Sequence, residues 1–410
     1  MSDVVLTQDE LDGLAANLLV SKKPPLSRAR ISEWLDEYGN RVGQHYASEL
    51  RRHYSEASQQ KGVATRIAFG LTRIDRSAGL RSGDMRSTLI GEMPSHLRRS
   101  MGAKRRTALI GISAWLILVG AGAAGWFRFD LVTELFLLAP WLTVPLGSQL
   151  LHTGEAPGHG SFILRNPALQ QCAAAIATAS FLLPAGRAAA LLASAWLGVC
   201  AAFLLDGLRR LIRWRATSFK QFSFAAGEGY LLVAGLWLVA SRLGAHPAGF
   251  QEPIVLLTAI HFHFAGFLTA VFAGLTYDQL RTSRWAPIFQ ALLLAAVVGP
   301  GLLGMAFLVG PKLKLIAALP IVIGQCGLPA GMIRIGWPKA RRHSWEWLLV
   351  VSGASVAIAM ILAGAWALGE YPLQAFLDLT QMERIHGTLN AFGFGLLGLF
   401  GWLSVAKSSS

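Results

Sequence analysis

The stretch PIVLLTAIHFHFAGFLTAVFAGLT, residues 253–276, decides the fold. It contains no lysine, arginine, aspartate or glutamate. A helix needs about 20 mostly apolar residues to cross the hydrocarbon core of a bilayer. The stretch therefore predicts a transmembrane helix, and its two histidines place ionisable side chains at membrane depth, where such groups are costly.

Similar apolar segments lie on both sides of this stretch, and the third of them is the shortest. The predicted fold is an all-α, polytopic bundle of about ten transmembrane helices. The segments are 107–126, 129–151, 168–185, 187–208, 225–244, 253–276, 286–309, 313–333, 346–369 and 384–406.

Residues 1–106 differ in composition from the remainder, with 18 lysines and arginines and 12 acidic residues against 19 and 11 in 107–410. We therefore predict a cytoplasmic, mostly helical N-terminal region over 1–106 and a transmembrane domain over 107–410. The N-terminus has early acidic residues and no apolar core, so it is not a signal peptide, and the first membrane helix provides the insertion signal.

Loop charges predict the orientation. With the N-terminus in the cytoplasm, 13 basic residues fall on the inner side and six on the outer side. The positive-inside rule thus favours ten spans with both termini cytoplasmic. The inner residues are Arg165, Arg209, Arg210, Arg213, Arg215, Lys220, Arg281, Arg284, Arg334, Lys339, Arg341, Arg342 and Lys407, and the outer ones are Arg128, Arg187, Arg242, Lys312, Lys314 and Arg384.

The net charge of +14 does not indicate a nucleic-acid partner, because much of it lies in these loops and no zinc-finger or RNP-like motif accompanies it. The expected partners are membrane lipids and a hydrophobic small-molecule substrate. The three cysteines lie in apolar segments, where thiols behave as small apolar groups. The sequence predicts no metal ligands, and it does not identify a cofactor or an oligomeric state.

Polar residues from separate segments share the outer half of the predicted membrane. Counting 1.5 Å per residue from the outer helix ends places most of them at similar depth, with Gln325 nearer the midplane. A polar pocket is the inference. The residues are Glu134, His261, His263, Gln325, His386 and Asn390.

These residues suggest roles in acid–base catalysis. Glu134 is the candidate acid, and His261 or His263 the candidate base, since residues two apart on a regular helix point about 200° apart. His386 and Asn390, four residues apart, share a face and would orient a substrate, with Gln325 as a further binding residue. Hydrogen-bonded bridges between helices, and snorkelling of Glu134 toward the surface, are the structural alternatives.

Other ionisable residues are predicted to be structural. Asp206 precedes Arg210 by four residues and is expected to pair with it. Glu228 and the Tyr277–Asp278 pair lie near predicted cytoplasmic helix ends. Glycines in the last segment are expected to let other helices approach closely. They are Gly387, Gly393, Gly395 and Gly398.

Three strings carry a resemblance to a known family. They are TELFLLAPWLTVPLG (133–147), GFQEPIVLLTAIHFHFAGF (249–267) and RIHGTLNAFGFGLLGLFGWL (384–403). They resemble the YndJ-like family of bacterial membrane proteins over most of 107–406. The resemblance implies a polytopic bacterial membrane protein, so the expected location is the inner (cytoplasmic) membrane. It implies no settled activity, so no functional residue is carried over.

Four functions are compatible with these features. The first is a membrane-embedded acid–base enzyme, an isomerase or cyclase, acting on an apolar lipid-like substrate. The second is a proton-coupled transporter. The third is a haem or metal protein using His386 with His261 or His263. The fourth is a structural or sensory protein with 1–106 as its interaction module.

Overall fold

A computed structural model describes residues 95–127, 129–151, 162–214, 218–309, 311–340, 345–369 and 379–408. The chain divides into two units, Met1–Leu89 and Ile90–Ser410. The predicted N-terminal region lies outside the described residues up to residue 94. From Ser95 the chain is helical through the predicted boundary at 106, because α6 runs from Ser95 to Ala123.

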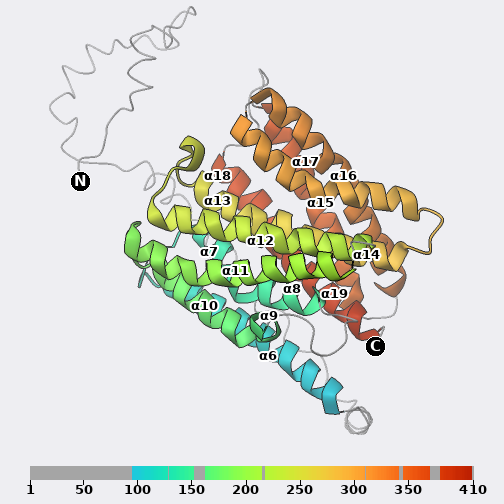
Figure 1. The fold of residues 1–410 in the computed structure, drawn as a ribbon, viewed down its shortest axis with the longest axis horizontal. Helices are drawn as coiled ribbons and strands as arrows, with labels where there is room; N and C mark the ends of the chain where they lie inside the picture. The colour runs from blue at the N-terminus through green and yellow to red at the C-terminus, as the bar shows by residue number, and fades with distance from the viewer. Residues whose placement is uncertain are drawn as a thin grey trace, which may run out of the picture. The chain divides into compact units, whose positions relative to one another are not determined.

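The described residues form helices and contain no strand, which confirms the all-α fold class (Figure 1). The elements after α6 are α7 (Leu131–Leu138), η2 (Ala139–Thr143), α8 (Val144–Leu151), α9 (Phe162–Arg165), α10 (Pro167–Ser180), α11 (Arg187–Trp214), α12 (Phe219–Leu243), η3 (Pro247–Gly249), α13 (Ile254–His261), η4 (Phe262–Leu268), α14 (Thr269–Leu280), α15 (Ala286–Val309), α16 (Pro311–Ala340), η5 (Trp345–Trp347), α17 (Leu348–Gly369), α18 (Leu379–Met382), η6 (Glu383–Gly387), η7 (Leu389–Leu396) and α19 (Leu397–Ser408).

Within the described ranges, eight helical segments are long and apolar enough to cross a membrane. They match eight of the ten predicted segments. The third predicted segment is α10, whose 14 residues are short for a span. The eighth is α16, a helix of 30 residues with three internal prolines.

Three spans are not regular α-helices. Each contains a π-helical stretch: η2 lies between α7 and α8, η4 lies between α13 and α14, and η6 and η7 lie between α18 and α19. Pro140 at the start of η2 lacks the N–H that an α-helical bond needs there. The π stretches also contact one another, η2 against η4 and η4 against η7. Wide turns of this kind recur at functional sites.

Aromatic side chains of η4 pack on glycines of neighbouring helices. A Cβ added at Gly147 of α8 would lie 2.7 Å from the Phe267 ring, and one at Gly395 of η7 would lie 3.1 Å from the Phe264 ring. Both phenylalanines are buried. Close contacts at Gly387, Gly393 and Gly398 likewise confirm the predicted approach of other helices to the last segment. The π stretch η4 therefore lies at the centre of the bundle.

The bundle has a long two-helix hairpin and a second group of three helices. The antiparallel helices α11 and α12 run side by side, and α15, α16 and α17 pack in sequence (Figure 1). Gly324 of α16 meets the backbone of Ala296 of α15 so closely that an added Cβ would clash with the Ala296 amide nitrogen. This contact sets the distance between the two helices.

Replacing Gly324 with alanine is expected to lower the free energy of unfolding by about 1–3 kcal/mol, because the clash is with backbone and α15 must move. Thermal unfolding of the detergent-purified protein, followed by tryptophan fluorescence, measures the change. Gly198→Ala is the matched control, since nothing lies within 4 Å of its added Cβ. Equal melting temperatures for the two variants would show that this contact does not set the helix spacing.

Candidate functional site

His263 is fully buried between three helices. Its Nε2 accepts a hydrogen bond from Trp196 Nε1 of α11 at 3.0 Å, and its Nδ1 lies 2.8 Å from the carbonyl oxygen of Ala259. The ring stacks on Trp196 with centroids 6.1 Å apart, and the Phe136 ring meets its edge at 5.5 Å.

These contacts fix the protonation of His263. A carbonyl oxygen only accepts, so Nδ1 carries the proton, and Nε2 is then the acceptor for the indole N–H. The imidazole is therefore neutral with both nitrogens engaged. It joins α11 to η4, which is the structural alternative that the sequence left open.

His261 and His386 lie in different surroundings. His261 ends α13 and is exposed, whereas His386 in η6 is half-buried and donates from Nδ1 to the carbonyl oxygen of Ala359 at 2.8 Å. The segments that carry them, α13 and η6, both pack against α7. Within the described residues, neither His386 Nε2 nor either nitrogen of His261 has a hydrogen-bond partner.

Asn390 supports the turn that holds His386. Its Nδ2 donates to the His386 backbone carbonyl at 2.9 Å, so the two residues lie on the same side of the helix. The side-chain bond from His386 to Ala359 and this backbone bond together fix the ring on its helix. The position of His386 Nε2 is therefore fixed, although this nitrogen makes no hydrogen bond among the described residues.

Glu134 lies close in the fold to the His386 turn, but its carboxylate points elsewhere. The neighbouring Leu135 lies 3.0 Å from a Cβ added at Gly387, so α7 packs against η6. A Cβ added at Gly122 of α6 would lie 3.9 Å from Glu134 Oε1. No hydrogen bond or ion pair joins this carboxylate to a described histidine.

Gln325 lies on a separate part of the bundle. It is buried on α16, beside the glycines that pack on α15, and its Oε1 has no partner among the described residues. The structure thus joins His386 to Asn390, places His261 and Glu134 on segments that pack against one another, and gives Gln325 other neighbours.

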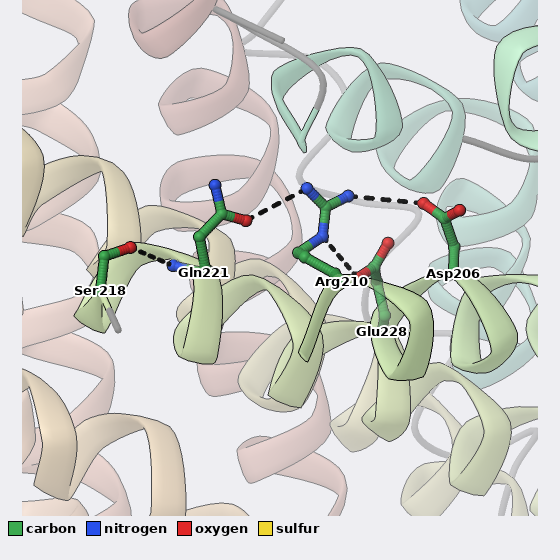
Figure 2. Close-up of polar contacts among 5 residues, drawn as sticks. All are labelled: Asp206, Arg210, Ser218, Gln221 and Glu228. Atoms are coloured by element: carbon green, nitrogen blue, oxygen red, sulfur yellow. Dashed lines mark hydrogen bonds and ion pairs between the residues drawn. The ribbon is translucent and has the colours of Figure 1, made fainter. Parts of the chain in front are cut away.

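A second polar cluster lies between α11 and α12 (Figure 2). Arg210 Nη2 donates to Asp206 Oδ2 at 3.4 Å, its Nε to Glu228 Oε2 at 3.3 Å, and its Nη1 to Gln221 Oε1 at 3.3 Å. The side chains of Arg210 and Glu228 are 3% and 0% exposed. A charged group this deeply buried persists only with partners.

The pairing of Asp206 with Arg210 confirms the prediction from their spacing. The ion pair of Glu228 agrees with the structural role predicted for it, but its partner was not predicted, because Arg210 lies on the preceding helix. The sequence did contain an indication of this pair. Glu228 is an acidic residue inside an apolar segment, and Arg210 is a basic residue at the end of the preceding segment. Asp278, predicted to be interfacial, is partly exposed and pairs with Lys220 at 2.9 Å.

Long apolar helices with charges paired inside the bundle define a polytopic integral membrane protein. A family model described as YndJ-like protein matches residues 134–394, so the chain belongs to the YndJ-like family. The uncharacterized membrane protein YndJ of Bacillus subtilis (strain 168) is 27% identical over 198 residues, which cover 48% of this chain and 35% of that relative. No solved structure matches the chain.

The family match includes the residues of both polar clusters and at least part of each π-containing helix. It confirms the resemblance of the three strings. Within the described ranges, no group of three or more histidine, cysteine, aspartate or glutamate side chains is arranged to hold a metal ion.

Proposed function

We propose that the chain is a membrane-embedded acid–base protein in which His261 and His386 are the proton-transferring groups. The observation that supports the proposal most strongly is that two imidazoles, on segments that both pack against α7, have ring nitrogens with no hydrogen-bond partner among the described residues. His263 is not a candidate for the base, because proton transfer to it would break its bond with Trp196.

Isomerisation or cyclisation of an apolar, lipid-like molecule is the chemistry that this pair suits. A neutral histidine accepts a proton near neutral pH, and a protonated partner returns one at a second position. The substrate's composition is unchanged, so no co-reactant is required. Glu134 lies on α7, which packs against the His386 segment, and would serve as the reservoir of that proton.

Solvent deuterium provides the test. Full-length protein in nanodiscs, incubated in deuterated buffer with a total bacterial lipid extract, is expected to label one lipid species at carbon, because each cycle returns a solvent-derived proton. Mass spectrometry of the extracted lipids measures the labelling. We expect His261→Ala and His386→Ala each to reduce the rate at least about a hundredfold, the usual contribution of one acid–base group.

His246→Ala is the matched control, because His246 is exposed and lies outside the spanning helices. It should label lipid at the wild-type rate. Unchanged labelling in both His261→Ala and His386→Ala would contradict the proposal, as would the absence of labelling with the wild-type protein over the whole extract.

Proton-coupled transport is the second candidate, supported by the buried cluster of Asp206, Arg210 and Glu228. Ionisable groups at membrane depth commonly belong to proton or ion pathways. Solute-dependent proton flux in proteoliposomes, without lipid labelling, would favour it. For the haem alternative, a visible absorption band of the purified protein that disappears in His386→Ala would be the supporting result.

The orientation is part of the proposal. Loop charges support insertion in a bacterial inner membrane with both termini in the cytoplasm. In that orientation Arg209, Arg281 and Arg334 lie at the cytoplasmic ends of the helices, and the chain before the first membrane helix is cytoplasmic.

A further inference from the structure

An open groove of about 690 Å³ lies where the end of α14 meets the end of α16. Its polar side chains are Gln279 and Arg334, and the remainder of its surface is apolar or aromatic. The residues that form it are Gln279, Leu280, Ala330, Ile333, Arg334, Ile335, Trp337 and Pro338.

The charged residue that lines the groove is Arg334. It is exposed, and within the described residues no acidic side chain pairs with it. The nearby Arg281 differs, because it binds Asp278 at 3.5 Å, and Asp278 also holds Lys220. The planar guanidinium of an arginine without an acidic partner can donate two parallel N–H bonds to two oxygens of a phosphate group.

One exposed tryptophan lines the groove, and three more lie in the chain at the connections that follow α14 and α16. Trp337 is 58% exposed within it, and Trp345 and Trp347 begin the helix that follows α16. Trp285 precedes α15, and the Arg284 guanidinium lies 5.0 Å from its ring centroid. Tryptophan is enriched at the level of lipid headgroups. The groove is therefore expected to lie at the membrane–water interface.

An apolar track leads from the groove toward the middle of α16. Ile323, Cys326, Ala330, Arg334 and Trp337 are all exposed, at spacings of three and four residues that place them on one helix face. The charged and aromatic members lie near the helix end, whereas the others lie deeper. A phospholipid whose phosphate lies in the groove would thus have its acyl chains along this face.

We propose that this groove binds the headgroup of an anionic phospholipid. Arg334 would engage the phosphate and Gln279 would donate to a headgroup oxygen, while the acyl chains lie against Ala330 and Ile323. The arrangement combines a cation, an amide, an aromatic rim and an apolar track on one surface. The inference is independent of the proposed acid–base chemistry, since none of these residues belongs to the histidine pair.

Native mass spectrometry of the full chain, purified in detergent and titrated with phosphatidylglycerol or phosphatidylcholine, tests it. The wild-type protein is expected to retain one phosphatidylglycerol in preference to phosphatidylcholine. Arg334→Gln should weaken that retention about fivefold, the effect of one basic residue near an anionic surface. Ala330→Trp, which fills the groove without changing charge, should also weaken it.

Arg187→Gln is the matched control, because Arg187 is exposed at the start of α11 and does not line the groove. It should bind lipid as the wild type does. Equal retention by the wild type, Arg334→Gln and Ala330→Trp would overturn the proposal and leave only nonspecific annular lipid. Displacement of the bound lipid by inorganic phosphate at similar concentration would also overturn it, by assigning the groove to free phosphate.

Discussion

Arg210→Ala is expected to lower the free energy of unfolding by about 3–5 kcal/mol, the cost of leaving buried carboxylates without their cation. Asp206 and Glu228 both bond to this guanidinium, and Glu228 is fully buried. Unfolding of the detergent-solubilised protein in a temperature ramp, read by tryptophan fluorescence, measures the loss.

Arg209→Ala is the matched control for this variant. Arg209 precedes Arg210 on α11 and is exposed, so its removal should change stability by less than about 0.5 kcal/mol. A second variant, Glu228→Gln, retains the shape of the side chain and an acceptor for Arg210, and should therefore be milder than Arg210→Ala. Similar melting temperatures for the two arginine variants would exclude a structural role for the cluster.

His263→Ala is expected to destabilise the protein by about 2–5 kcal/mol, because it opens a cavity beside Trp196 and leaves the indole N–H without an acceptor. His263→Phe fills the space without an acceptor and should recover part of that loss. Thermal unfolding of these variants measures the effect, and a double-mutant cycle with Trp196→Phe isolates the hydrogen bond.

The comparison with His261→Ala separates packing from chemistry. His261 is exposed, so its removal should leave the melting temperature nearly unchanged while abolishing lipid labelling. His263→Phe should show lowered stability with labelling retained at low temperature. The reverse pattern would assign the proton transfer to His263.

The helices were predictable because their signal is local. A run of about 20 apolar residues identifies a span whatever its neighbours are. This rule is weakest at α10, whose 14 residues fall short of a span. The close approach of other helices to the glycines of the last segment was also predictable, since small residues mark close helix contacts.

The relation between the polar residues was less predictable. Counting residues from the helix end gave His261 and His263 a similar depth in the membrane. Only the packing of α11 shows that Trp196 donates a hydrogen bond to His263. The π stretches widen the turns at the segments that carry these histidines, so residue counting on a regular helix gives only approximate directions there. The ion pair of Glu228 could not be predicted without knowing which helix lies beside α12.

The charge pairing between α11 and α12 also bears on how the chain enters the bilayer. A charged residue at the centre of a single inserting helix costs about 2.5–3.5 kcal/mol. Asp206 and Arg210 pair within α11, whereas Glu228 lies on α12 and bonds to Arg210 only when the two helices are adjacent. The two helices should therefore leave the translocon as a preformed hairpin rather than one after the other.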